Sequence, residues 1–208
     1  MWGGAPAPLV QAPQVCPERA LESPRGAGAP PHTAFRYTIV MSRQTTFKGG
    51  PLDLAGPELK VGEKAPDFVA VDKGLQEVTL EKTGQGVRVF SVVPSLDTPV
   101  CDMQTKRFND AAGKMPKVTF YNVSMDLPFA QNRWCASFGI DNVKMLSDHK
   151  YASFGEHFGT LIKDWRVESR AIFVIDSNNV LQYVEYVPEV AEHPHYEAVI
   201  AKAKELAG

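Results

Sequence analysis

Short apolar runs alternate with longer amphipathic segments along residues 41–208, and this alternation predicts strands interleaved with helices. Residues 87–93 and Ala171–Ile175 are β-branched and apolar almost throughout, which is typical of central strands. Residues 99–113 instead repeat apolar side chains at helical spacing, and Gly113 is the expected end of that helix. The predicted apolar stripe of this helix consists of Val100, Met103, Phe108 and Ala111 or Ala112.

The remaining predicted elements are shorter, and turn residues mark their ends. A glycine pair at residues 49–50 predicts a β-hairpin within residues 45–54. Further strands are expected at residues 65–72, 76–80, 117–124, 143–146 (an edge strand) and 180–187, the last forming a hairpin with Ala171–Ile175, and helices at residues 128–138 and 195–206. The order of elements is similar to that of a thioredoxin-like fold of the α/β class. Such a fold has a mixed central β-sheet flanked by helices, here with an N-terminal β-hairpin.

Residues 1–40 differ from the rest of the chain in composition. They contain seven prolines and four glycines and show little apolar periodicity, so we expect a disordered leader followed by one domain at residues 41–208. The leader lacks a basic segment followed by an apolar one, so it does not resemble a secretory signal. We expect that the native product can start at Met41, and we assign no role to Cys16.

Charge and cysteine content narrow the classes of function. The net charge of −2 argues against a nucleic-acid partner, and no apolar run reaches the roughly 18 residues of a membrane-spanning helix. The three cysteines, Cys16, Cys101 and Cys135, are too few and uneven in number for the disulfide framework of a small secreted domain. We therefore expect a cytoplasmic protein whose thiols do chemistry.

Cys101 lies where a predicted buried strand is followed by a helix. Pro94 cannot donate to a strand ladder, so the strand should stop there, while Thr98 and Pro99 are suited to the N-cap and first position of the helix. Cys101 then lies in the first helical turn, where unpaired N–H groups favour an anion. We expect a lowered pKa for this thiol and high nucleophilicity at neutral pH.

Several other chemistries find less support in the sequence. Cys101 and Arg107 have the Cys-x5-Arg spacing of phosphate-binding loops, but the segment between them has no glycine and is predicted to be helical. The chain has no Cys-x-x-Cys motif, so a dithiol oxidoreductase is disfavoured. His193 and His195 form a close pair without further ligands at metal-site spacing. No glycine-rich phosphate loop occurs, and we expect no cofactor.

Three separate segments carry a resemblance to a known family. Residues 94–101 (PSLDTPVC), 126–131 (DLPFAQ) and 170–176 (RAIFVID) resemble the bacterial thiol peroxidases, which are atypical two-cysteine peroxiredoxins. The resemblance covers residues 41–208. It implies a homodimeric enzyme that reduces hydrogen peroxide and organic hydroperoxides, needs no haem or flavin, and is recycled by thioredoxin.

The same resemblance implies roles for individual residues. Cys101 matches the peroxidatic cysteine, whose thiolate attacks the peroxide and becomes a sulfenic acid. Thr98 matches the threonine that contacts this thiolate and the peroxide, Pro94 shields the site from water, and Arg170 supports the thiolate and polarises the peroxide. Cys135 matches the resolving cysteine, which forms a disulfide with Cys101. On intact helices the two cysteines are expected to lie beyond the roughly 7 Å bridging limit, so we infer local unwinding in each turnover.

Simpler interpretations of these residues remain open from the sequence. Thr98 also serves as an N-cap, Pro94 as a strand terminator, and an arginine such as Arg170 is most often a partner in a surface ion pair. Cys135 fits a small core side chain as well as a resolving cysteine. Aromatic residues of the following segment either form a groove for alkyl peroxides or belong to the core; they are Phe129, Trp134 and Phe138. A redox-sensing thiol module that oxidises a protein partner would use the same cysteines.

Overall fold

The computed structural model describes residues 43–208. The expectations for the leader at residues 1–40 and for Cys16 lie outside these residues. The described strands are β1 Gln44–Phe47, β2 Gly50–Asp53, β3 Val69–Val71, β4 Glu77–Thr79, β5 Val87–Val92, β6 Val118–Ser124, β7 Val143–Ser147, β8 Leu161–Ile162, β9 Val167–Glu168, β10 Ala171–Ile175 and β11 Leu181–Tyr186. The helices are η1 Glu81–Thr83 (a 3₁₀ turn), α1 Pro99–Gly113, α2 Pro128–Phe138, α3 Ser153–Phe158 and α4 Tyr196–Ala207.

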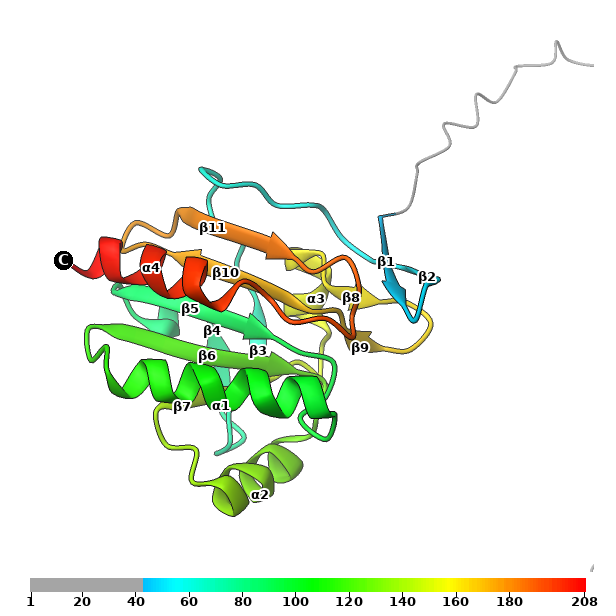
Figure 1. Ribbon diagram of the computed structural model, residues 1–208, viewed down its shortest axis with the longest axis horizontal. Coiled ribbons are helices and arrows are strands. Elements are labelled where there is room, and N and C mark those ends of the chain that lie inside the picture. Colours follow the sequence, from blue (N-terminus) through cyan, green and yellow to red (C-terminus); the bar gives the residue numbers. More distant parts are fainter. Residues whose placement is uncertain (1–42) are drawn as a thin grey trace, which may run out of the picture. The chain divides into compact units, whose positions relative to one another are not determined.

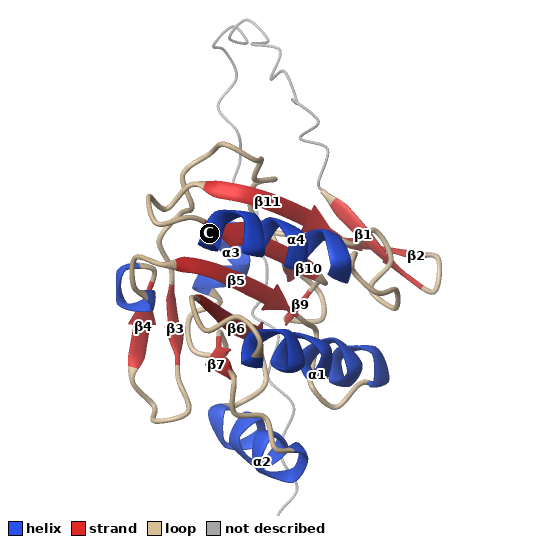
Figure 2. Ribbon diagram, turned by 60° about the vertical axis from the view of Figure 1, so that its left-hand side comes forward, coloured by secondary structure: helices blue, strands red, loops and turns tan. Residues whose placement is uncertain are grey.

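A seven-stranded mixed sheet forms the centre of the domain, in the order β11-β10-β5-β6-β7-β3-β4 (Figure 1). β5, β6 and β7 are parallel, whereas β10 runs antiparallel to both β5 and β11. Helices α1 and α4 cover one face of the sheet and α3 covers the other, which can be seen in both Figure 1 and Figure 2. The predicted α/β fold, its mixed sheet and its N-terminal hairpin, β1–β2, are confirmed.

Strand β7 is not at the edge of the sheet, so the edge position predicted for residues 143–146 is wrong. β7 pairs with β6 along its length and is bridged on its other side to β3 through Val71 and Ser147. The β3–β4 hairpin therefore forms this edge. Strand length and apolar pattern are local properties, whereas a hairpin from an earlier part of the chain adds to the sheet through long-range pairing.

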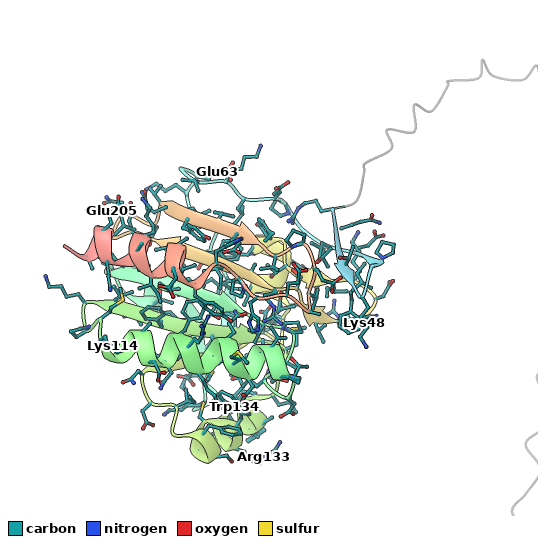
Figure 3. All side chains as sticks on the ribbon, viewed as in Figure 1. Lys48, Glu63, Lys114, Arg133, Trp134 and Glu205 are labelled. Atoms are coloured by element: carbon teal, nitrogen blue, oxygen red, sulfur yellow. The ribbon has the colours of Figure 1, made fainter. Side chains whose placement is uncertain are left out.

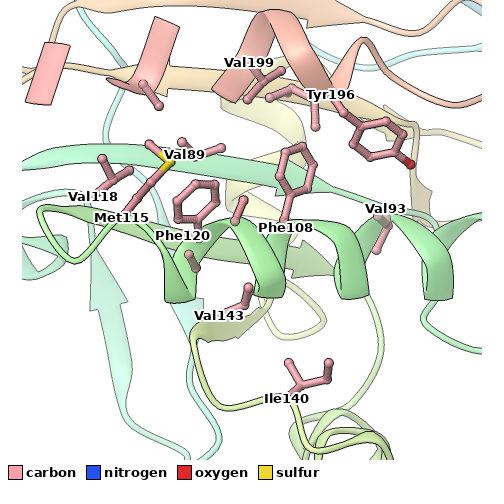
Figure 4. Packing of buried hydrophobic residues seen from close by; sticks show 14 of the residues in the cluster. Val89, Val93, Phe108, Met115, Val118, Phe120, Ile140, Val143, Tyr196 and Val199 are labelled. Carbon is pink, nitrogen blue, oxygen red and sulfur yellow. The ribbon is translucent and has the colours of Figure 1, made fainter. Parts of the chain in front are cut away.

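Two hydrophobic clusters lie on opposite faces of the sheet, and alternate residues of β5 belong to different ones. Val89 packs with Phe108 and Phe120 under α1 and α4 (Figure 4), whereas Phe90 packs with Phe154 of α3 on the other face. A strand with apolar packing on both faces needs the nearly continuous apolar run seen in the sequence. No helix within residues 43–208 has both the length and the apolar character needed to span a membrane.

The buried face of α1 differs from the predicted apolar stripe. Met103 is 50% exposed, and the buried positions that follow Cys101 at helical spacing are Gln104, Thr105 and Phe108. Two of these side chains are polar, so a search for apolar periodicity places the stripe on a neighbouring face. Buried polar residues on a helix require hydrogen-bond partners. Gln104 bonds to Ser91 and Arg170, and Thr105 bonds to the Cys101 carbonyl and Asn122.

A pair of buried carboxyl groups, Asp148 and Glu168, lies beside α3. Asp148 accepts hydrogen bonds from the backbone N–H groups of Phe154 and Gly155, and the fully buried Glu168 lies beside it, accepting one from Thr160. Burial, and then the charge of Asp148, raises the pKa of Glu168 well above its usual value. Glu168 therefore holds a proton in the folded protein at a pH where an unfolded chain has lost it.

Stability should consequently fall as the pH rises from about 4.3, the ordinary value for glutamate, towards the raised pKa of Glu168. In that window the folded state binds more protons than the unfolded state, so each pH increment favours unfolding. Glu168→Gln should flatten this dependence, measured as the urea-unfolding free energy across the window. Glu205→Gln, at an exposed position, is the control, and identical slopes for wild type and Glu168→Gln would contradict the assignment.

Candidate active site

The chain presents Cys101 at the start of α1. β5 ends at Val92, Thr98 takes the N-cap position with extended backbone angles, and Pro99 is the first helical residue. The Cys101 side chain is fully buried. The expected placement of Cys101 in the first helical turn, after a buried strand, is confirmed.

Thr98 does not cap the helix with its side chain, although it occupies the N-cap position. Its hydroxyl oxygen lies 2.7 Å from Cys101 Sγ and 3.1 Å from the Ser95 carbonyl oxygen. A hydroxyl has one proton, so it donates either to the carbonyl or to the sulfur. A negatively charged sulfur is the stronger acceptor, so ionisation of Cys101 would draw this proton towards it.

Arg170 lies immediately before β10 rather than within the strand, and it is buried against Cys101. Its Nη2 is 3.3 Å from Cys101 Sγ, Nη1 donates to Gln104 Oε1 at 2.6 Å, and Nε donates to the Val190 carbonyl at 3.0 Å. The side chain is 1% exposed, which contradicts the surface ion-pair interpretation. These contacts hold the planar guanidinium in one orientation, with one edge directed at the sulfur.

Two residues of this arrangement, Gln104 and Ser91, were missed by the sequence analysis. Gln104 follows Cys101 by three residues on α1, and its Nε2 donates to Ser91 Oγ on β5 at 2.7 Å. Both side chains are buried, and together they link Arg170 to the central strand. A polar residue one turn after the cysteine, on the face that packs against the sheet, was the available signal.

Asp126 anchors the loop that leads to Cys101. Its carboxylate accepts hydrogen bonds from the Ser95 hydroxyl at 2.7 Å, the Leu96 backbone N–H at 2.8 Å and the Ser124 hydroxyl at 2.9 Å. Ser95 also supplies the carbonyl that faces the Thr98 hydroxyl. The resemblance includes this aspartate in its second segment, and the structure shows how it ties the loop to the end of β6.

Asp126→Ala should therefore loosen the loop and slow the reaction of Cys101 with peroxide by about tenfold or more, since three donors lose their acceptor. Asp126→Asn is the matched variant. Its amide oxygen can still accept from Leu96, and its NH₂ can donate to the Ser95 oxygen, so most of the rate should remain. Stopped-flow kinetics of both variants test this, and equal rates for Asp126→Ala and wild type would contradict it.

Pro94 is half-buried and follows the last residues of β5 that pair with β6. Val93 still donates its N–H to the Val123 carbonyl at 3.0 Å, and the ladder stops at Pro94. The expected role of Pro94 as a strand terminator is thus confirmed.

Cys135 lies on α2, half-buried, and packs against the core cluster that contains Cys101. Both cysteines are free thiols, and burial raises the pKa of Cys135. Cys101 faces Arg170 at the start of β10, whereas Cys135 lines a cavity beside β7. α1, which carries Cys101, packs on β6 and β7, and α2, which carries Cys135, packs on β7. The two thiols therefore lie on helices that cover the same part of the sheet, but the contacts of their sulfur atoms differ.

The aromatic residues of α2 divide between core and surface. Trp134 is 7% exposed and lies on the side of the helix that faces the sheet, unlike its neighbour Arg133 (Figure 3). Phe129 is 69% exposed, and Phe138 packs on Trp134 with its ring under the Lys106 ammonium group. Trp134 is thus a core residue, and only Phe129 and Phe138 remain on the surface.

The alternative chemistries find no support in the geometry. α1 is helical from Pro99 onwards, and the Arg107 guanidinium lies 4.5 Å above the Tyr196 ring rather than at Cys101, so no phosphate loop forms. His193 and His195 have separate partners, the Tyr196 hydroxyl and the Glu185 carboxylate. Within residues 43–208, no three His, Cys, Asp or Glu side chains are grouped to hold a metal ion.

A thioredoxin-like fold with a buried cysteine at a helix N-terminus is typical of thiol-dependent oxidoreductases, and comparison with known proteins agrees with this class. Residues 60–200 match the Redoxin family. The thiol peroxidase of Bacillus subtilis is 51% identical over 163 residues, which are 78% of this chain and 98% of that protein. The thiol peroxidase of Clostridium acetobutylicum is 49% identical over 158 residues, 76% of this chain and 96% of that protein.

Solved structures of related proteins share the fold of this chain. A peroxiredoxin-like protein from Aquifex aeolicus has a TM-score of 0.74 and 46% identity, covering 79% of this chain and 98% of its own. A thiol peroxidase from Chromobacterium violaceum shares the fold with a TM-score of 0.71 at 20% identity, covering 78% and 95% of the two chains. The chain belongs to the bacterial thiol peroxidases, within the peroxiredoxin-type oxidoreductases.

Proposed function

We propose that this enzyme reduces hydrogen peroxide and organic hydroperoxides at Cys101 and is recycled through a Cys101–Cys135 disulfide by thioredoxin. The contact of Arg170 Nη2 with Cys101 Sγ, at 3.3 Å in a buried environment, is the observation that carries the proposal. A permanent positive charge beside a cysteine at a helix N-terminus favours a thiolate, which is the reactive form. Neither an inert packing cysteine nor a structural arginine needs this arrangement.

In the first step, the Cys101 thiolate attacks the terminal oxygen of the peroxide. The S–O bond forms as the O–O bond breaks, giving a sulfenic acid at Cys101 and a hydroxide or alkoxide that takes up a proton and leaves as water or alcohol. Arg170 and Thr98 supply the donors for the negative charge that moves from sulfur to oxygen. Pro94 is proposed to limit the access of water.

In the second step, the Cys135 thiolate attacks the sulfenic sulfur and expels hydroxide, which is protonated to water. Both cysteines are free thiols on separate helices, and a disulfide tolerates at most roughly 7 Å between Cα atoms, so we propose that α2 unwinds around Cys135 to reach Cys101. The unwound segment exposes the disulfide to the attacking thiolate of thioredoxin. The family resemblance supports thioredoxin as the reductant and a homodimer as the working form.

The test is NADPH consumption by the purified chain with thioredoxin and thioredoxin reductase after adding cumene hydroperoxide or hydrogen peroxide. Sustained turnover is the expected result. A Cys101–Cys135 disulfide that forms without turnover would instead favour the redox-sensing module. The absence of both turnover and this disulfide would overturn the proposal.

Thr98 variants test the hydroxyl contact with the sulfur. Thr98→Val keeps the shape of the side chain but removes the donor 2.7 Å from Cys101 Sγ, so peroxide reduction should slow roughly 100-fold. Thr98→Ser keeps the hydroxyl and should retain most of the rate. Competition kinetics against a reference peroxidase measure both, and a fast Thr98→Val enzyme would show that the contact does not contribute.

A further inference from the structure

A cavity of about 620 Å³ opens next to Cys135, and we call it the Cys135 cavity. It lies between α2, β7 and the β3–β4 hairpin, which are neighbours in both Figure 1 and Figure 2. Its apolar lining includes Val78, Tyr121, Ile140 and Met145. The volume is within the range of small-molecule sites, and none of the residues that contact Cys101 Sγ lines it.

The polar lining of this cavity favours an anion. Lys73, Lys82 and Lys144 line it, against two carboxylates, Asp72 and Asp141. The Asp72 carboxylate already accepts two backbone N–H groups of its own turn, at 2.8 and 2.9 Å. The Lys82 ammonium group donates to the Glu77 carbonyl at 2.8 Å, so we assign the negative group of a ligand to Lys73 and Lys144. A ligand with one negative group and an apolar body matches these two lysines beside the apolar lining.

We propose that the Cys135 cavity binds an amphipathic carboxylate, such as a fatty-acid anion, and that the bound ligand slows disulfide formation by holding α2 folded. The apolar tail lies against Tyr121 and Met145, and the carboxylate lies among the lysines. The inhibitory part rests on the proposed function, because it requires Cys135 to leave its place and reach Cys101.

The coupling follows from the composition of the cavity wall. Asn132, Cys135 and Ala136 all belong to α2, so unwinding of α2 removes one side of the cavity. A ligand that binds the folded form but not the unwound form lowers the population of the unwound form by a factor of 1 + [L]/Kd. A ligand concentration of ten times Kd should therefore slow disulfide formation by about tenfold.

Binding is tested first, with the reduced full-length chain and dodecanoate below its micelle concentration. Isothermal titration calorimetry should show saturable binding of one dodecanoate, and dodecyltrimethylammonium should not bind. Lys73→Gln combined with Lys144→Gln should weaken binding by about three- to tenfold. Ala136→Phe, which fills the cavity from an exposed helical position, should abolish binding, whereas Lys163→Gln, outside the cavity, should change nothing. If neither the double lysine variant nor Ala136→Phe changes the affinity for dodecanoate, the proposed site is overturned.

The kinetic test uses one equivalent of hydrogen peroxide, acid quenching and mass spectrometry to follow sulfenic acid and disulfide separately. With dodecanoate at ten times Kd, disulfide formation should slow about tenfold, while sulfenic acid forms at the unliganded rate. Binding without this slowing would overturn the coupling to α2. If the ligand-free chain forms no Cys101–Cys135 disulfide at all, the proposed function fails, and the calorimetric result still decides the ligand site by itself.

Discussion

Cys101→Ser should abolish peroxide reduction while the fold remains intact. Serine fits the buried space beside Thr98 and Arg170, but its hydroxyl stays protonated at neutral pH and cannot take up and release oxygen as a sulfur does. We expect no NADPH consumption above the uncatalysed rate, at any peroxide concentration. Circular dichroism and the urea-unfolding midpoint should stay close to wild type, and retained turnover would refute the assignment of Cys101.

Cys135→Ser is the matched variant for this experiment, because it removes a thiol from the other end of the proposed cycle. It should consume about one equivalent of peroxide per chain and then stop, since the sulfenic acid at Cys101 has no resolving partner. Mass spectrometry should find an oxidised Cys101 and no intramolecular disulfide. Full cycling of Cys135→Ser with thioredoxin would assign resolution to another thiol.

Arg170→Met should slow the reaction of Cys101 with peroxide by roughly 100- to 1000-fold, the range for removal of a donor directed at developing charge. Methionine fills much of the space, but the contact with Cys101 Sγ and the hydrogen bonds to Gln104 and Val190 are lost. Arg170→Lys keeps the charge but cannot make these contacts together, so an intermediate rate is expected.

The chain offers a control in Arg88, which is also 1% exposed. Its guanidinium donates to the Gly84 carbonyl at 2.7 Å and to Asn179 Oδ1 at 2.8 Å, joining two turns. Arg88→Met should lower the unfolding free energy but leave the peroxide rate of the folded fraction unchanged. If both variants lose the same rate, the effect of Arg170 is one of stability rather than chemistry.

The course of the chain around Cys101 could be predicted from the sequence because local rules decide it. A β-branched run, a proline that ends it and a Thr-Pro helix start place the cysteine in a first helical turn, whatever packs around it. The same local patterns predicted the β1–β2 and β10–β11 hairpins and helices α1, α2 and α4. The short helix α3 and the β8–β9 pair were not predicted, since six-residue and two-residue elements show too little periodicity.

The surroundings of the sulfur depended on contacts between distant parts of the chain. Apolar periodicity does not distinguish Arg88 from Arg170, because each lies beside a buried strand segment, yet the fold directs one to two turns and the other to Cys101. The role of Gln104 was not predicted, because a polar residue on a buried helix face interrupts the apolar periodicity. Its partner Ser91 also lies 13 residues away in the sequence. The motif resemblance identified Arg170 and Cys135, but not what they contact.

The class of fold, the helix start that presents Cys101 and the family of the chain could thus be read from the residues alone. The interior position of β7, the contacts of Arg170 and Thr98 with one sulfur, and the cavity beside Cys135 became known from the folded structure. Secondary structure follows backbone and side-chain preferences over a few residues. A site instead needs residues far apart in sequence to meet, and the pairing of strands and the packing of both sheet faces bring them together.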